Sequence, residues 1–402
     1  MTILNDSQDG SYRLPSRAAL EPIDTVKSLK IGIVGAGIGG LIAAVALLKS
    51  GHDVEMFEKS RFKSEVGAAI CAPPNSSRVL AYYGFDFESA RATRAESFII
   101  YDDPSNPDVK KMIPCTDYAH KYGAPWYFFH RVDLHSELRK MATEPTDTQP
   151  RIARLHLGTS VSRVDENGTL HFEDGTSAQK DVVIAADGIR VHGWASIRTI
   201  TNTDKRATIY GCRGGSLQNI GLIYPPQFSV DANGNDISDR EDFANTVIVK
   251  FPKTIQSVCR QAKGVGQWSL FTRTPLERLT RGRVVVIGDA AHPMPPLRAQ
   301  GAAMAIEDAA ALGVLLSNLD SKEEISARLD MFNELRLKRV AATQILSSEH
   351  EWKPTRLSEE QRGYFDGKVP QTEDDVYRYS FEHDVIRDAL KILQEYRQRN
   401  SF

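Results

Sequence analysis

The chain has few cysteines, little net charge and no long apolar run, and these absences exclude several large classes of protein. Among 402 residues it has only four cysteines, Cys71, Cys115, Cys212 and Cys259, without C-x-x-C or metal-ligand spacing. We therefore expect free thiols in a reducing, cytoplasmic compartment and no metal site. The net charge is only -2, and no strongly basic region of the sequence suggests a nucleic-acid partner. No apolar run approaches the ~18 residues of a membrane span.

What remains is an ordinary globular composition, 41% hydrophobic and 25% charged, in a chain long enough for two lobes. Residues 1–28 are polar and lack an apolar core, so we expect a disordered extension rather than a signal peptide. Nucleotide-type βαβ patterns occupy residues 29–72, 131–190 and 280–320, and predict one α/β domain built from three segments. Stretches 73–130 and 196–279, rich in aromatic and turn residues, predict a second, α+β domain inserted in pieces. Residues 165–175 predict a small antiparallel hairpin, and residues 321–402 predict helices.

The most informative feature is a pair of glycine-containing strand-turn patterns about 250 residues apart. The first spans residues 30–40, Lys-Ile-Gly-Ile-Val-Gly-Ala-Gly-Ile-Gly-Gly. Gly35 permits a tight turn out of the strand, Gly37 lets the backbone approach a pyrophosphate, and Gly40 lets the helix pack on the sheet. Glu58 ends the next strand and suits the hydroxyls of an unphosphorylated ribose.

The second pattern spans residues 283–293, where Gly288 and Asp289 follow the strand-like run Val-Val-Val-Ile. Gln300 and Gly301 then precede a helix-like stretch from Ala302 to Leu316. Two such patterns could hold the two ends of one dinucleotide, which points to FAD.

With these residues in place, the chain resembles the single-component class A FAD-dependent aromatic hydroxylases, in particular their salicylate-hydroxylase-like branch in fungal secondary metabolism. The resemblance covers about residues 29–345. It implies a para-hydroxybenzoate-hydroxylase-like α/β fold, with a Rossmann-like FAD-binding domain, an interleaved substrate domain and a helical C-terminus. It rests on Gly35-Ala-Gly37, His130-Arg131-Val-Asp133, Ala186-Asp187-Gly188, Tyr210-Gly-Cys-Arg and Gly288-Asp289-Ala-Ala-His.

The resemblance implies a role for individual residues. Asp289 would touch the ribityl and pyrophosphate part of FAD, and Arg131 would also contact FAD. The helix that begins at Gly301 and Ala302 would point its N-terminus at the flavin, where its positive end stabilises negative charge. Tyr210 would deprotonate or hold a phenol, although a strand tyrosine can equally be a core residue. Ala68 and Ala69 would line the flavin, and Asp187 and Gly188 would bridge flavin and NAD(P)H or form a plain turn.

The activity implied is hydroxylation of a small phenolic or related electron-rich molecule with NAD(P)H and O₂, and the chain is compatible with an oligomer. The chain departs from the family between Gly188 and Tyr210, where only residues 189–209 intervene. A strand or more of the substrate domain is expected to be absent there, through divergence or a gene-model artefact. Two alternatives therefore stay open: a flavin-dependent oxidase or dehydrogenase, and a catalytically impaired FAD-binding protein.

Overall fold

A computed structural model describes residues 28–62, 69–100, 111–188, 198–199, 206–224, 246–262, 266, 270–348 and 352–400. The extension that was expected to be disordered lies almost entirely outside the described residues, as does most of the interval 189–209.

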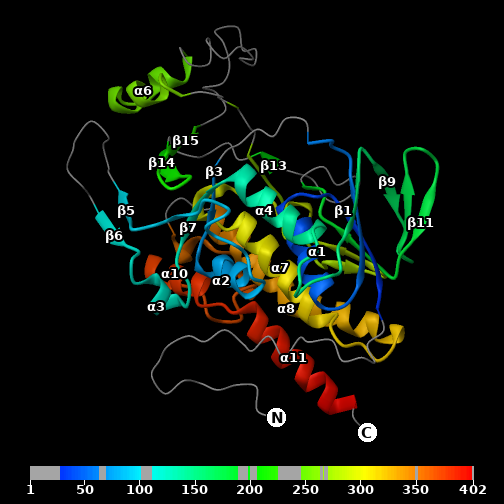
Figure 1. The fold of residues 1–402 in the computed structure, drawn as a ribbon. Coiled ribbons are helices and arrows are strands. Elements are labelled where there is room, and N and C mark those ends of the chain that lie inside the picture. Colours follow the sequence, from blue (N-terminus) through cyan, green and yellow to red (C-terminus); the bar gives the residue numbers. More distant parts are fainter. Residues whose placement is uncertain are drawn as a thin grey trace.

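A six-stranded sheet forms one end of the molecule (Figure 1), and its strands come from distant parts of the chain. Its order is β17-β18-β12-β1-β2-β8, and all neighbours are parallel except the edge pair β17 and β18. The central strand is fully covered, since Ile31 and Ile33 are 0% exposed, as expected of a parallel sheet. The strands are β1 Lys30–Val34, β2 Asp53–Glu58, β8 Arg154–Leu157, β12 Val182–Ala185, β17 Thr280–Arg281 and β18 Val284–Val286.

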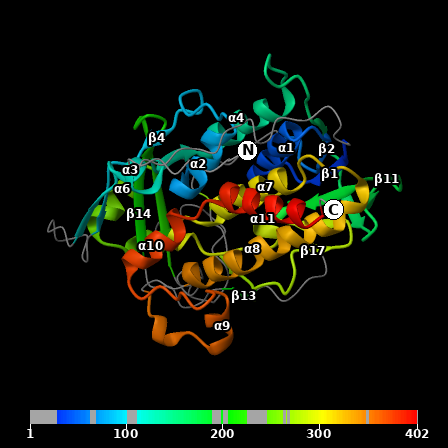
Figure 2. The same cartoon turned by 90° about the horizontal axis from the view of Figure 1, so that it is seen from below.

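Helices α1 (Ile38–Lys49) and α7 (Gly301–Leu315) form the centre of the core. Both are apolar on nearly every face, which is typical of buried helices. They pack closely because a side chain at Gly313 would lie only 2.8 Å from the Cβ of Ala46. Helices α8 (Ile325–Ser348) and α11 (Val385–Asn400) lie along α7 (Figure 2), so residues from the C-terminal part of the chain complete the core.

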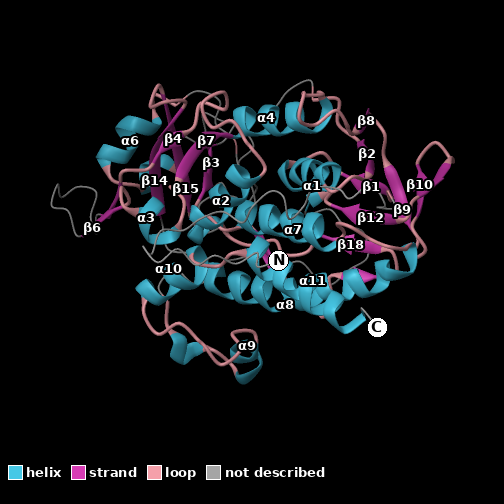
Figure 3. Cartoon of the chain, turned by 60° about the horizontal axis from the view of Figure 1, so that its bottom comes forward, coloured by secondary structure: helices cyan, strands magenta, loops and turns pink. Residues whose placement is uncertain are grey.

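The second group of strands lies at the opposite end of the molecule (Figure 3). It contains the three-stranded sheet β3-β7-β4 and two hairpins, one of β5 and β6 and one of β14 and β15. Strands β14 and β15 pair over seven residues, and the described residues add no third strand to this sheet. The strands of this group are β3 Ala69–Ala72, β4 Thr93–Arg94, β5 Ser97–Ile100, β6 Lys111–Pro114, β7 Tyr127–His130, β14 Arg206–Cys212 and β15 Leu217–Ile223, and helices α3 Tyr118–Tyr122 and α6 Lys253–Cys259 lie with them. Strands β13 Arg198–Thr199 and β16 Phe271–Thr272 form a separate two-stranded sheet. Helix α2 (Pro74–Tyr82) packs on α7, and helix α4 (Arg131–Thr143) packs on α1.

Two local predictions are confirmed. The expected hairpin is present as part of a three-stranded antiparallel sheet of β9 (Val161–Val164), β10 (Thr169–Phe172) and β11 (Ser177–Gln179). The C-terminus is helical, with α9 (Glu359–Gly363) and α10 (Glu373–Phe381) between α8 and α11. Among the described residues, no helix is both long and apolar enough to cross a bilayer.

Candidate functional site

The glycine-rich turn after β1 has room only for glycine at two of its positions. Gly35 has φ +97°, and a Cβ there would lie 2.6 Å from the carbonyl oxygen of Ala186. A Cβ at Gly40 would lie 2.1 Å from the carbonyl oxygen of Gly35, so the helix returns against its own strand. At Gly37, by contrast, no atom of the part of the chain that the structure describes lies within 4 Å of a Cβ position. Packing within the protein does not demand glycine at this position, but the close approach of a pyrophosphate would.

Glu58 lies beside this turn at the carboxyl end of β2 and is half-buried. One carboxylate oxygen accepts a hydrogen bond from the backbone N–H of Ala36 at 2.8 Å, and the other accepts one from the N–H of Ser60 at 2.7 Å. A carboxylate oxygen can accept more than one bond. Glu58 is therefore held in place with acceptor capacity left for a ribose hydroxyl.

The segment after β12 meets the glycine-rich turn. The N–H of Ala186 donates to the carbonyl oxygen of Val34 at 2.9 Å, and a Cβ at Gly35 would lie 2.9 Å from the Cα of Asp187. Gly188 has φ +81°, and no atom of the described residues lies within 4 Å of a Cβ position there. The structure thus brings together two motifs that lie about 150 residues apart in the sequence.

The second glycine-containing pattern forms a short turn on α7. Asp289 lies in the 3-10 turn Gly288–Ala290 with its side chain open to solvent, yet burial raises the pKa of its carboxyl group, against the effect of nearby Arg131. A Cβ at Gly301 would lie 4.0 Å from the Asp289 carboxylate. Asp289, Arg131 and the start of α7 therefore lie together.

The N-terminus of α7 is available to a negatively charged group. Gln300 precedes the helix without a side-chain cap, and the first turn contains no acidic residue. The unbonded N–H groups and the helix dipole give this end a partial positive charge. Ala302 is half-buried in the same turn. Ala69 begins β3 and donates its N–H to the side chain of Asn219 at 3.1 Å, whereas Ala68 lies outside the described residues.

Tyr210 lies on β14 and stacks on Phe128 of β7, with ring centroids 4.7 Å apart. Burial and the neighbouring Cys71 raise the pKa of its hydroxyl group. Tyr210 belongs to an apolar cluster that reaches Ala299, two residues before α7 begins. Tyr210 and Ala299 therefore pack against the same group of buried residues. This group contains Cys71, Ala95, Phe98, Cys115, Tyr118, Tyr122, Trp126, Phe128, Tyr210, Ala299, Tyr377 and Phe381, which we call the aromatic cluster.

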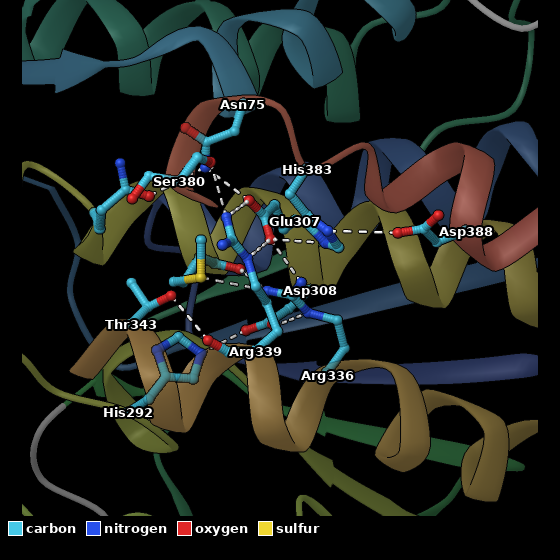
Figure 4. Close-up of polar contacts among 12 residues, drawn as sticks. Asn75, His292, Glu307, Asp308, Arg336, Arg339, Thr343, Ser380, His383 and Asp388 are labelled. Carbon is cyan, nitrogen blue, oxygen red and sulfur yellow. Dashed lines mark hydrogen bonds and ion pairs between the residues drawn. The ribbon is translucent and has the colours of Figure 1, made fainter. Parts of the chain in front are cut away.

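The structure also shows a buried ionic network that the sequence reading did not single out (Figure 4). Glu307 and Asp308, adjacent on α7, are 0% and 1% exposed. Arg336 of α8 binds both carboxylates, and Arg339 binds Glu307. The sequence contains a signal for this network, because two acids within an apolar helix must be buried and therefore need cationic partners.

Comparison with known proteins agrees with this geometry. A model of the FAD binding domain family matches residues 199–346, and one of an NAD(P)-binding Rossmann-like domain matches residues 33–64. The FAD-dependent monooxygenase phomE' of Diaporthe leptostromiformis is 32% identical over 397 residues, covering 84% of this chain and 97% of the relative. Hispidin-3-hydroxylase of Neonothopanus nambi is 29% identical over 422 residues, covering 91% and 96%.

Solved structures share the fold. A tetrameric form of 2-methyl-3-hydroxypyridine-5-carboxylic acid oxygenase superposes with a TM-score of 0.67 at 20% identity, covering 90% of this chain and 98% of that one. A salicylate hydroxylase substrate complex gives 0.64 at 21% identity, covering 90% and 97%. The expected fold and cofactor are confirmed. The chain belongs to the FAD-dependent monooxygenases, within the class A flavoprotein aromatic hydroxylases.

Proposed function

We propose that the protein uses NAD(P)H and O₂ to insert one oxygen atom into a small phenolic or related electron-rich aromatic molecule. When bound, FAD supplies the electron transfer and oxygen activation that side chains cannot. Relatives named as hispidin-3-hydroxylase and as the 6-hydroxynicotinate 3-monooxygenase of Pseudomonas fluorescens, the latter 28% identical over 363 residues, support this reaction class.

The observation that carries the proposal is the position of Tyr210. Its ring lies in the aromatic cluster, which extends to Ala299 and so to the start of α7. Apolar walls exclude water and favour a flat ring. Because the raised pKa keeps the Tyr210 hydroxyl protonated, we assign it the role of donating a hydrogen bond to a substrate oxygen, rather than that of a base.

We assign FAD binding to residues from three parts of the chain. The glycine-rich turn and Glu58 would hold the adenosine and pyrophosphate, and Asp289 with Arg131 would hold the ribityl and pyrophosphate region. The segment after β12 would lie between flavin and NAD(P)H. The residues are Gly35, Gly37, Gly40, Glu58, Ala69, Arg131, Asp187, Gly188, Asp289, Gly301 and Ala302. Residues 29–72, 131–190 and 280–320 would thus form the FAD-binding domain.

An isotope experiment tests the reaction class. The purified protein is incubated with NADH or NADPH and a panel of phenols and hydroxypyridines under ¹⁸O₂. Mass spectrometry then measures the incorporation of ¹⁸O into the products. We expect one ¹⁸O atom per product molecule and no turnover without reduced nicotinamide. Oxidised product with oxygen from water would indicate the oxidase or dehydrogenase. NAD(P)H consumption that no panel member accelerates would favour the impaired FAD-binding protein.

A further inference from the structure

Asp308 connects α7 to the turn that presents Asp289. One of its carboxylate oxygens accepts the backbone N–H of Gly288 at 3.1 Å and the Nε2–H of His292 at 2.6 Å. These two donors flank Asp289 in the sequence. The other oxygen accepts the Nε–H of Arg336 at 2.9 Å. A single carboxylate therefore holds both ends of the Gly288–His292 turn and is itself held by α8.

The turn lies directly on the helix at this point. Gly288 has φ +59°, and a Cβ there would lie 3.2 Å from the Cβ of Ala305. The turn is closed by hydrogen bonds from the backbone N–H groups of Ala291 and His292 to the carbonyl oxygen of Gly288, at 2.9 and 2.8 Å. Inside this closed turn, Asp289 points to the solvent-open side, toward the start of α7 at Gly301.

Burying the carboxylate of Asp308 is energetically unfavourable, and the need to fill space in the core does not explain why a charged residue is found there. Asp308 is 1% exposed and His292 0%, and desolvating a charge costs several kcal/mol unless its partners are well placed. Apolar residues of similar volume often fill such a position with equal stability. What an apolar residue cannot do is accept the N–H of Gly288 and the ring N–H of His292 together. The arrangement therefore favours a role in fixing the turn.

We propose that Asp308 is a positioning residue for FAD binding: through Gly288 and His292 it fixes Asp289 at the start of α7, where the cofactor is held. Asp308 does not touch the cofactor itself. Its effect on FAD affinity is exerted through Asp289, so removing Asp289 should remove most of that effect.

Neighbouring Glu307 provides a matched control. It is equally buried on the same helix and also binds Arg336, at 2.6 Å. Its other partners are Asn75, Arg339 and His383, and among the described residues none of these contacts reaches the Gly288–His292 turn. Glu307→Gln and Asp308→Asn both remove one buried charge beside Arg336. Only the second changes the oxygen that accepts both N–H groups of the turn, because a neutral amide is a weaker acceptor than a carboxylate.

The test measures the dissociation constant of FAD for the full-length protein and its variants, by flavin fluorescence, together with thermal unfolding. We expect both single variants to unfold at lower temperature. Only Asp308→Asn should weaken FAD binding by about tenfold or more, the loss expected for hydrogen bonds to a charged group. In an Asp289→Ala background the same substitution should weaken FAD by less than about threefold, because coupled residues are not additive.

Three results would overturn the proposal. Asp308→Asn could leave FAD affinity unchanged, Glu307→Gln could weaken FAD as much as Asp308→Asn does, or the effects of Asp308→Asn and Asp289→Ala could simply add. If Asp308→Asn does not fold, His292→Ala takes its place, since it removes one donor of the turn and leaves Asp308 with the other two. That variant should give a smaller loss of FAD affinity that also disappears in the Asp289→Ala background, and an additive loss would count against the proposal.

Discussion

Among single residues, Glu58 gives the most direct test of the proposed FAD site. Replacing it by Ala removes the proposed acceptor for the ribose and also the bond from Ala36 that fixes the glycine-rich turn. A charge-assisted hydrogen bond contributes about 1.5–3 kcal/mol, so we expect the FAD dissociation constant to rise roughly 10- to 150-fold. Asp53→Ala, on the exposed start of the same strand, is the control and should bind FAD normally. Unchanged affinity in Glu58→Ala would argue against a ribose contact.

Tyr210 is predicted to act on substrate rather than on FAD. Tyr210→Phe keeps the stacking on Phe128 and removes only the hydroxyl group. If that hydroxyl donates one neutral hydrogen bond, kcat/KM for the aromatic substrate should fall roughly 3- to 10-fold, with little change in FAD affinity. Because the pKa of Tyr210 is raised, the pH profile of turnover below about pH 10 should keep its shape. Tyr118→Phe, elsewhere in the aromatic cluster, controls for the loss of a buried hydroxyl, and an equal loss there would contradict the assignment.

Among elements, the contact between α7 and α8 should depend on pH. The buried arginines Arg339 and Arg336 outweigh desolvation and hold the pKa of Glu307 well below its ordinary 4.5. A depressed folded-state pKa gives stability that is present above the unfolded pKa and lost as pH falls toward the folded one. Glu307→Gln should therefore cost about 3 kcal/mol at pH 7, and less below about pH 4. Chemical unfolding of both proteins across this range measures the difference. A constant difference at every pH would rule out this linkage.

The strand-turn elements could be predicted from sequence because most of their chemistry is local. Gly40 is required by a clash with the carbonyl oxygen of Gly35, five residues earlier, and Glu58 follows from the strand that it ends. The partner of Asp308 could not be predicted, because Arg336 lies on another helix and only packing brings the two together. The same applies to Tyr210, whose pairing with Phe128 depends on how two separate sheets meet.

For the whole molecule, we expect a yellow protein with about one non-covalently bound FAD per chain. Acid or heat precipitation should release the flavin into solution, and chromatography should identify it as FAD. Precipitated protein that stays yellow would instead indicate a covalent link. Stoichiometric FMN would contradict the two-ended dinucleotide site.

The short interval 189–209 leads to a second prediction at this scale. If part of the substrate-domain wall is absent there, water enters the site. Some of the electrons from NAD(P)H then reduce O₂ to H₂O₂ without forming hydroxylated product. We expect the ratio of hydroxylated product to NAD(P)H consumed to be clearly below one. The measurement pairs product quantification with peroxide detection, and the native transcript is sequenced across codons 188–210. A ratio near one would show that the site is complete in this chain.

The six-stranded sheet has a consequence for how the protein is made. Its central strand β1 precedes its partner β12 by about 150 residues, and helix α7, which packs on α1, ends only at Leu315. Loops of this length close slowly and leave apolar strands uncovered in the meantime. During synthesis β1 can pair with nearby β2, but its other edge stays unpaired until β12 has been made. Cofactor capture can only be a late event, and a chaperone that shields the first 60 residues would be expected to raise the yield of flavin-loaded protein.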